Sequence, residues 1–261
     1  MWRTVAGAAA VSTLLLGAGA CDKAAPQPGA DPAASGAAGS AQSPRDALLA
    51  AAPSATGKSY RYVQKDVSGV FAGVVDPTAG SASMETSVAG PDGIKITLAF
   101  ASADAAFWTK IGFSRDLPTL KIPKGWTKVD TAKLKDKTLA VSLNGSDPTN
   151  AKAIFSLADA VTGSAGAYQG TADLSKLPAG TVLTAEELTA LGELAKTVPF
   201  SATVDVEGRL SNLTLKMPAA GKVKADDKTI TYSAYGTATL PAMPVDGKPA
   251  PASVYQILNA G

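Results

Sequence analysis

Residues 81–101, SASMETSVAGPDGIKITLAFA, decide the fold of this chain. Apolar residues alternate with polar or small residues over 94–100, so that the apolar side chains share one face of a strand. Asp92-Gly93 is a strong signal for a tight turn between two antiparallel strands. The stretch therefore predicts a β-hairpin of strands 81–89 and 93–101 with one apolar face.

The same kind of pattern continues on both sides of this hairpin. Further strands are predicted at 58–66, 69–76, 107–111, 126–130, 168–174, 200–206, 213–217 and 228–235. Leu210 is out of phase with the alternation at 213–217, and this indicates a β-bulge.

Helices are expected at three places. Ser43-Pro44 supplies an N-cap and a first-turn proline for a short helix that Pro53 stops. Asp147-Pro148 opens a second helix. Its apolar stripe is Ile154, Leu157, Ala158 and Val161. A capping box of Thr184 and Glu187 opens the third. Its stripe is Leu188, Leu191, Leu194 and Ala195.

Sequential hairpins with two helices inserted together predict an α+β fold built on one large antiparallel sheet. About nine strongly twisted strands tend to curl, and two helices cannot tightly cover the concave face of such a sheet. A cavity between sheet and helices would suit an apolar ligand, although each residue proposed to line it could equally be ordinary core. The candidates for this lipid cavity are Ile96, Leu98, Phe100, Ile154, Phe155, Leu191, Phe200 and Val204.

The N-terminus has the pattern of a bacterial lipoprotein signal. Arg3 is followed by an apolar run at 5–16, which is too short to span a bilayer, and then by small residues before Cys21. We expect cleavage before Cys21 and attachment of a diacylglycerol to its thiol, which would anchor the protein to the outer face of the cell membrane. Ala18-Gly19-Ala20 also matches an ordinary signal-peptidase site, and the alternative is a secreted protein.

The chain is accordingly divided into four parts. Residues 1–20 are a signal peptide, and 21–42 are a lipidated cysteine and a tether rich in Ala, Gly, Pro and Ser that we expect to be disordered. Residues 43–238 form the folded α+β domain. Residues 239–261 are a Pro-rich tail that we expect to be poorly ordered, apart from a segment at 254–258 that could dock.

Composition excludes several functions. The 24 basic and 22 acidic residues nearly balance, which gives no case for nucleic-acid binding. The chain has no histidine, and its one cysteine is Cys21, so a Ser-His-Asp triad and the usual zinc ligands are absent. We expect a monomer without enzymatic activity, cofactor or metal.

The body of the chain resembles the LppX/LprAFG-type actinobacterial lipoproteins. The resemblance rests on the leader with Cys21, the tether and the body at 43–236. Locally it is carried by the segments 107–111 (FWTKI), 191–193 (LGE), 198–200 (VPF) and 204–210 (VDVEGRL). It implies a half-open β-barrel with helices over its concave face, and binding of a lipid or glycolipid there. It assigns no catalytic residue.

Two other functions stay open. An anchored interaction module would have a filled core and a substantial exposed apolar patch. A hydrolase acting through carboxylates would need two acids roughly 5–10 Å apart in a cleft. The pairs Glu186-Glu187 and Asp226-Asp227 are weak candidates, because they also fit a first helical turn and a loop turn.

Overall fold

The computed structural model describes residues 42–260 except 138–139, 141–142, 144–146 and 243–246. The chain divides into a unit of residues 1–40 and a unit of residues 41–261, and all described residues belong to the second. The predicted signal peptide, Cys21 and nearly all of the predicted tether therefore lie outside the described residues.

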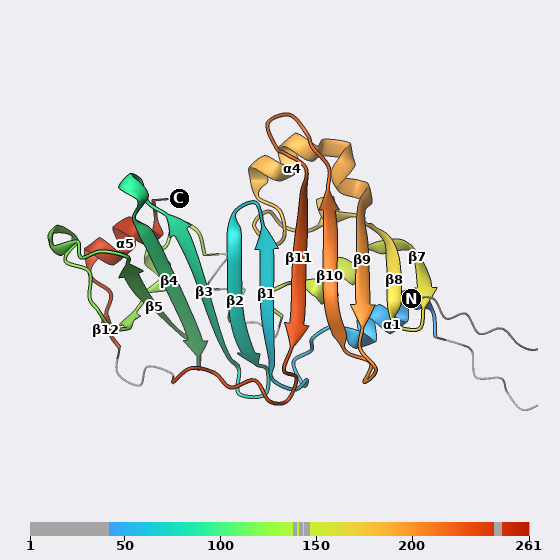
Figure 1. Ribbon diagram of the computed structural model, residues 1–261, viewed down its shortest axis with the longest axis horizontal. Helices are drawn as coiled ribbons and strands as arrows, with labels where there is room; N and C mark the ends of the chain where they lie inside the picture. The colour runs from blue at the N-terminus through green and yellow to red at the C-terminus, as the bar shows by residue number, and fades with distance from the viewer. Residues whose placement is uncertain (1–41, 138–139, 141–142, 144–146, 243–246, 261) are drawn as a thin grey trace, which may run out of the picture. The chain divides into compact units, whose positions relative to one another are not determined.

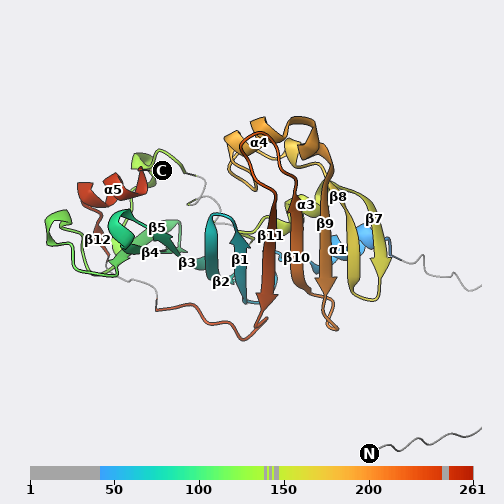
Figure 2. The same ribbon diagram turned by 45° about the horizontal axis from the view of Figure 1, so that its top comes forward.

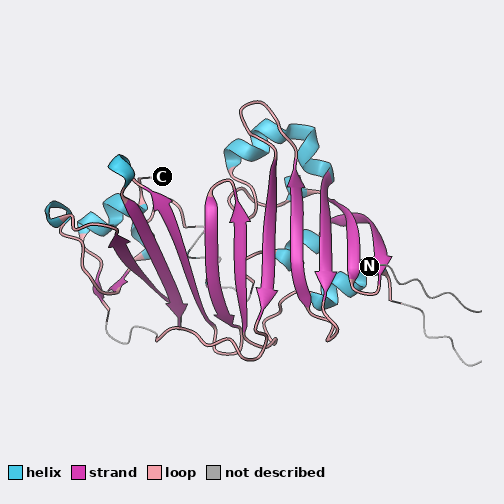
Figure 3. Ribbon diagram, viewed as in Figure 1, coloured by secondary structure: helices cyan, strands magenta, loops and turns pink. Residues whose placement is uncertain are grey.

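Within the described residues, twelve strands form one open sheet in the order β12-β6-β5-β4-β3-β2-β1-β11-β10-β9-β8-β7 (Figure 1). The strands are β1 (Tyr60–Asp66), β2 (Gly69–Asp76), β3 (Ser81–Ala89), β4 (Lys95–Ala103), β5 (Ala106–Phe113), β6 (Thr127–Lys128), β7 (Ala158–Ser164), β8 (Ala167–Ala172), β9 (Val198–Val204), β10 (Leu210–Met217), β11 (Asp226–Ser233) and β12 (Lys248–Pro249). Helices are few and short beside this sheet (Figure 3), and the predicted α+β class is confirmed.

The hairpin of β3 and β4 forms as its sequence predicts. Asp92 and Gly93 both have positive φ, 55° and 71°, in a three-residue loop, Pro91–Gly93. The N–H of Gly90 donates to the carbonyl of Ile94 at 2.7 Å, and the strands pair in register from Ala82 with Ser102 to Ala89 with Lys95.

Of two predicted details of the sheet, the bulge is present and the wholly antiparallel pairing is not. The register of β9 and β10 shifts between Leu210 and Asn212, which confirms the predicted bulge. The sheet is mixed and not wholly antiparallel, because β12 pairs with β6 in parallel.

In the described part of the chain, the helices are α1 (Pro44–Ala51), α3 (Ala151–Ser156), α4 (Ala185–Leu191) and α5 (Ala252–Leu258), with 3-10 turns η1 (Pro91–Gly93), η2 (Pro118–Leu120), η3 (Thr131–Lys133), η4 (Leu174–Lys176) and η5 (Gly192–Thr197). Ser43 caps α1 by accepting a hydrogen bond from the N–H of Asp46 at 3.1 Å. Thr184 and Glu187 form the predicted capping box of α4. Among the described residues, no helix has the length and apolar character needed to cross a membrane.

The second predicted helix is only partly right. The helix ends at Ser156, and Ala158 and Val161 lie in β7. The backbone of 158–164 pairs with β8, and Ala160 adopts a positive φ of 48° that no helix allows. Pairing with a neighbouring strand has overridden a helical spacing of apolar residues.

The described part of the tail forms secondary structure, and its segment 254–258 docks, as the sequence analysis allowed. Residues 248–249 form β12 and residues 252–258 form α5, at the end of the sheet where β6 and β5 lie (Figures 1 and 2). The hydroxyl of Tyr255 accepts a hydrogen bond from the N–H of Asp130 at 2.8 Å, and the side chain of Asn259 bonds the backbone of Lys133 and Lys135. Val254 is 1% exposed, so α5 also buries apolar surface.

The core contains side chains from both halves of the sheet and from α1 and α3. At the β7–β9 end, α1 packs against β7, β9 and α3. Helix α4 is joined to the sheet by an ion pair. Its residue Glu187 accepts a hydrogen bond from the ammonium of Lys228 on β11 at 3.0 Å. This ion pair is largely buried, with 19% of the Glu187 side chain and 10% of the Lys228 side chain exposed.

Replacement of Glu187 by glutamine should destabilise the protein by about 2–3 kcal/mol at neutral pH, because it leaves a buried ammonium without its counter-charge. Burial opposes ionisation of Glu187, but hydrogen bonds from Thr184 and Lys228 outweigh it and lower the pKa of the carboxyl. The stabilising contribution is therefore present above about pH 4.3 and is lost as pH falls through the folded-state pKa.

Chemical unfolding of wild type and Glu187→Gln between pH 3 and pH 8 measures this. The two curves should converge in acid. The exposed neighbour Glu186 serves as the control, and Glu186→Gln should stay within about 0.5 kcal/mol of wild type at every pH. A gap that persists unchanged at low pH would contradict the assignment.

Candidate functional site

One face of β2–β5 carries apolar side chains that the core leaves partly exposed. Leu98 lies opposite Thr86 on β3 and Ile111 on β5, and Thr86 lies opposite Phe71 on β2. Ile96 lies opposite Val88 and Phe113 in the same way. Directly opposed residues project to the same face of a sheet, so these side chains are neighbours.

We call the partly exposed members of this face the apolar strip. Its residues are Phe71, Met84, Val88, Ile96, Leu98 and Phe113. Each is neither fully buried nor fully solvated, and Val88 is the most exposed at 37%. The opposite face of the same strands carries polar residues such as Glu85, Lys95 and Thr97 near the β3–β4 turn, and buried Val74 and Trp108 farther along.

The apolar strip continues into the core along the strands. Phe100, two residues beyond Leu98 on β4, is 4% exposed, and its ring stacks on that of Phe107 with centroids 5.8 Å apart. Met84 and Leu98 pack against the core cluster to which these rings belong. The face thus passes from a closed core at one end of the strands to an open apolar surface at the other.

The eight residues proposed from the sequence divide between these two settings. Five are at most 4% exposed and belong to the core cluster: Phe100, Ile154, Phe155, Leu191 and Phe200. The rings of Phe155 and Phe200 lie 5.8 Å apart, so these side chains fill space between α3 and β9. Ile96 and Leu98 lie on the apolar strip. Val204, at the end of β9, is partly exposed and packs against the core cluster.

Sequence reasoning missed four members of the strip: Phe71, Met84, Val88 and Phe113. The turn signal alone does not place them, because a two-residue loop at Asp92-Gly93 would oppose Val88 to Thr97. The loop in fact has three residues, Pro91–Gly93, and this opposes Val88 to Ile96. Phe71 and Phe113 depend on registers with β2 and β5, which longer or less distinctive connections leave undetermined.

A cluster of tyrosines lies next to the strip. The ring of Tyr62 covers Gly73, and a Cβ added to Gly73 would lie 2.5 Å from ring atoms. Gly73 is opposed to Met84 of the strip. The Tyr62 side chain is 2% exposed, and its hydroxyl has no hydrogen-bond partner among the described residues. Burial raises the pKa of this hydroxyl, which therefore remains a donor.

Tyr232 on β11 lies opposite Tyr62, and its hydroxyl, in contrast, has a hydrogen-bond partner. Its hydroxyl and that of Thr149 lie 2.5 Å apart, and Thr149 donates to a carboxylate oxygen of Asp147 at 2.5 Å. Asp147 also accepts from the N–H of Lys152 at 3.1 Å. Burial raises the pKa of the Asp147 carboxyl despite these hydrogen bonds. The network fixes the segment before α3 to the sheet.

One acid of each carboxylate pair considered for hydrolysis has a structural role. Glu187 caps α4 and binds Lys228. Asp226 accepts a hydrogen bond from the N–H of Val67 at 3.0 Å in the neighbouring turn.

Comparison with known proteins adds little. No family model matches the chain, and no curated protein matches it. Among solved structures, the hypothetical protein CT021 from Chlamydia trachomatis aligns with 78% of this chain and 98% of its own. Its sequence identity is 10% and the TM-score is 0.31, too low to indicate a shared fold or function.

Tyr62→Phe should stabilise the protein by about 1 kcal/mol, because it removes a buried hydroxyl that has lost its water and gained no partner. The matched variant Tyr232→Phe should destabilise it by about 1 kcal/mol or more, because it removes the buried hydrogen bond between this hydroxyl and Thr149. Thermal unfolding of both variants measures the difference. Equal effects of the two substitutions would show that the Tyr62 hydroxyl is satisfied after all.

Proposed function

We propose that this protein is a surface lipoprotein, anchored through Cys21, that binds or carries a lipid or glycolipid. In this proposal the sheet is a half-open barrel with helices over its concave face, as the resemblance to the LppX/LprAFG-type family implies. The apolar strip is the contact for the acyl chains. Several observations on the described residues support the proposal.

The observation that carries the proposal is the apolar strip. It extends over four adjacent strands, about 14 Å at roughly 4.8 Å per strand, which is enough to hold part of an acyl chain. Covering it would remove apolar surface from water at about 25 cal/mol per Å². Its direct continuation into the core at Phe100 gives such a chain a closed end to lie against.

A second candidate function is supported by the packing of the core. Phe155 and Phe200 are in ring contact, and both are fully buried with Ile154 and Leu191. A core filled in this way is what an anchored interaction module would have, and the apolar strip would then be the surface that a protein partner covers.

The two functions are separated by native mass spectrometry of residues 41–261, which contain every described core residue, produced in a bacterial host and purified without detergent. A lipid carrier should show a bound mass of several hundred daltons that organic solvent releases. Replacing Ile96 and Leu98 together by asparagine should reduce the bound fraction more than tenfold, because each lost methylene contact is worth about fourfold.

The control is Thr97→Asn, on the same strand but on the opposite face, which should retain the bound mass. A clean mass without ligand in every host, the native one included, would favour the interaction module. Equal loss in the control would show that the apolar strip is not the binding surface.

The anchor is tested in cells. Wild-type protein should incorporate labelled palmitate and sediment with membranes, and Cys21→Ser should lose the label and appear in the soluble fraction. Two acyl chains at about 0.8 kcal/mol per buried CH₂ hold a protein on a bilayer stably. Wild-type protein that is unlabelled and released to the medium would establish the secreted alternative.

A further inference from the structure

Basic residues are concentrated in one stretch of an otherwise balanced chain. Eight of the 24 basic residues and three of the 22 acidic residues lie at 110–137, which gives this stretch a net charge of +5 in a chain of net charge +2. All eight basic side chains are exposed. They are Lys110, Arg115, Lys121, Lys124, Lys128, Lys133, Lys135 and Lys137.

The loop between β5 and β6, residues 114–126, combines this charge with apolar side chains. Leu120, at the end of η2, is 42% exposed and is followed directly by Lys121. Leu117, Ile122 and Trp126 are partly exposed in the same loop. Basic residues interspersed with leucine, isoleucine and tryptophan are typical of segments that lie in a membrane interface.

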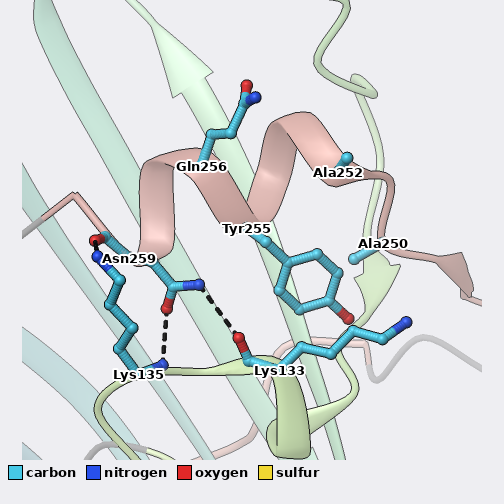
Figure 4. A pocket seen from close by; sticks show the side chains of 7 residues that line it. All are labelled: Lys133, Lys135, Ala250, Ala252, Tyr255, Gln256 and Asn259. Carbon is cyan, nitrogen blue, oxygen red and sulfur yellow. Dashed lines mark hydrogen bonds between the residues drawn. The ribbon is translucent and has the colours of Figure 1, made fainter.

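The tail helix lies against the same region. The hydroxyl of Ser253 donates to the carbonyl of Lys121 at 3.4 Å, and Figure 4 shows Lys133 and Lys135 beside α5. An open pocket of about 510 Å³ lies there. Its lining is Lys133, Lys135, Ala250, Ala252, Tyr255, Gln256 and Asn259. The helix itself carries no charged residue. We call loop 114–126, η3 and α5 together the basic end.

The basic end adjoins the open part of the apolar strip. Phe113, a member of the strip, immediately precedes the loop. Arg115 forms an ion pair with Asp92 of the β3–β4 turn at 4.0 Å, which brings the loop next to the ends of the strands that carry Val88 and Ile96. Figures 1 and 2 both place α5 and the β5–β6 loop at this end of the sheet.

We propose that the basic end is a docking surface for a bilayer that contains anionic lipids, with Leu120 entering the interface and the lysines facing phosphate headgroups. Anionic leaflets attract basic side chains within a Debye length, and the added contribution is about fivefold in affinity for each lysine. An acidic protein would use the charge, but exposed Leu120 and partly exposed Trp126 in the same loop favour an interface that also accepts apolar side chains. This goes beyond lipid binding in the strip and does not require it.

Vesicle flotation of residues 41–261 tests the proposal without the lipid anchor. The protein should float with vesicles of phosphatidylcholine and phosphatidylglycerol but not with phosphatidylcholine alone, and 0.5 M NaCl should release it. Lys121→Gln with Lys124→Gln should weaken binding about twentyfold, and Leu120→Ser should weaken it without reducing its dependence on salt.

The control is Lys222→Gln with Lys224→Gln, which removes the same charge from the exposed β10–β11 loop at another place in the fold. It should leave flotation unchanged. The proposal is wrong if anionic vesicles do not bind the protein, if the control pair weakens binding equally, or if the loop variants bind as wild type. Specific retention of an acidic protein by a chain that ignores vesicles would also overturn it.

The docking surface and the apolar strip can fail independently. Loop variants should keep the lipid mass that co-purifies with the protein, and the variant with asparagine at 96 and 98 should keep its flotation. Wild-type protein that floats with anionic vesicles but never carries co-purified lipid would thus refute the proposed ligand site alone.

Discussion

The register between β3 and β4 is the constraint on which the rest of this structure depends. The three-residue loop Pro91–Gly93, closed by the hydrogen bond from Gly90 to Ile94, sets the pairing of the two strands, and a slip by one residue would turn every apolar side chain to the other face. Phe100 would then leave the core, and Ile96 would leave the apolar strip. Core and candidate ligand surface are therefore set by the same turn.

The apolar face of the sheet is covered by other side chains at one end of its strands and left partly exposed at the other. Side chains of α1, α3 and the segment that Asp147 caps close the core, where aromatic rings contact one another. Toward the β3–β4 turn the same rows of side chains stay partly exposed. A surface of this kind is costly for a monomer unless something covers it at least part of the time, and this cost is why we assign it a ligand.

Much of the fold could be predicted from the sequence, because its signals are local. Alternation located β2 and β3 to the residue, the out-of-phase Leu210 marked the bulge, and Thr184 with Glu187 marked the start of α4. The predictions that failed concern segments whose structure depends on pairing with residues far away in the sequence. Ala158 and Val161 have helical spacing but join β8, and the tail finds partners on β6 and η3 that no local pattern reveals. For the same reason the sequence located two members of the strip and missed its neighbours on β2 and β5.

The pairing of β1 with β11 has a consequence for the order in which the molecule can assemble. Tyr62 is opposed to Tyr232, and in the sheet this pair of strands joins a half made of β2–β6 and β12 to a half made of β7–β10. The two halves cannot join until β11 has been synthesised, and β11 lies near the end of the chain. Until then β1 has an unpaired edge. A pairing between strands so far apart in the sequence forms late and slowly, and until it forms the free edges can pair with other chains.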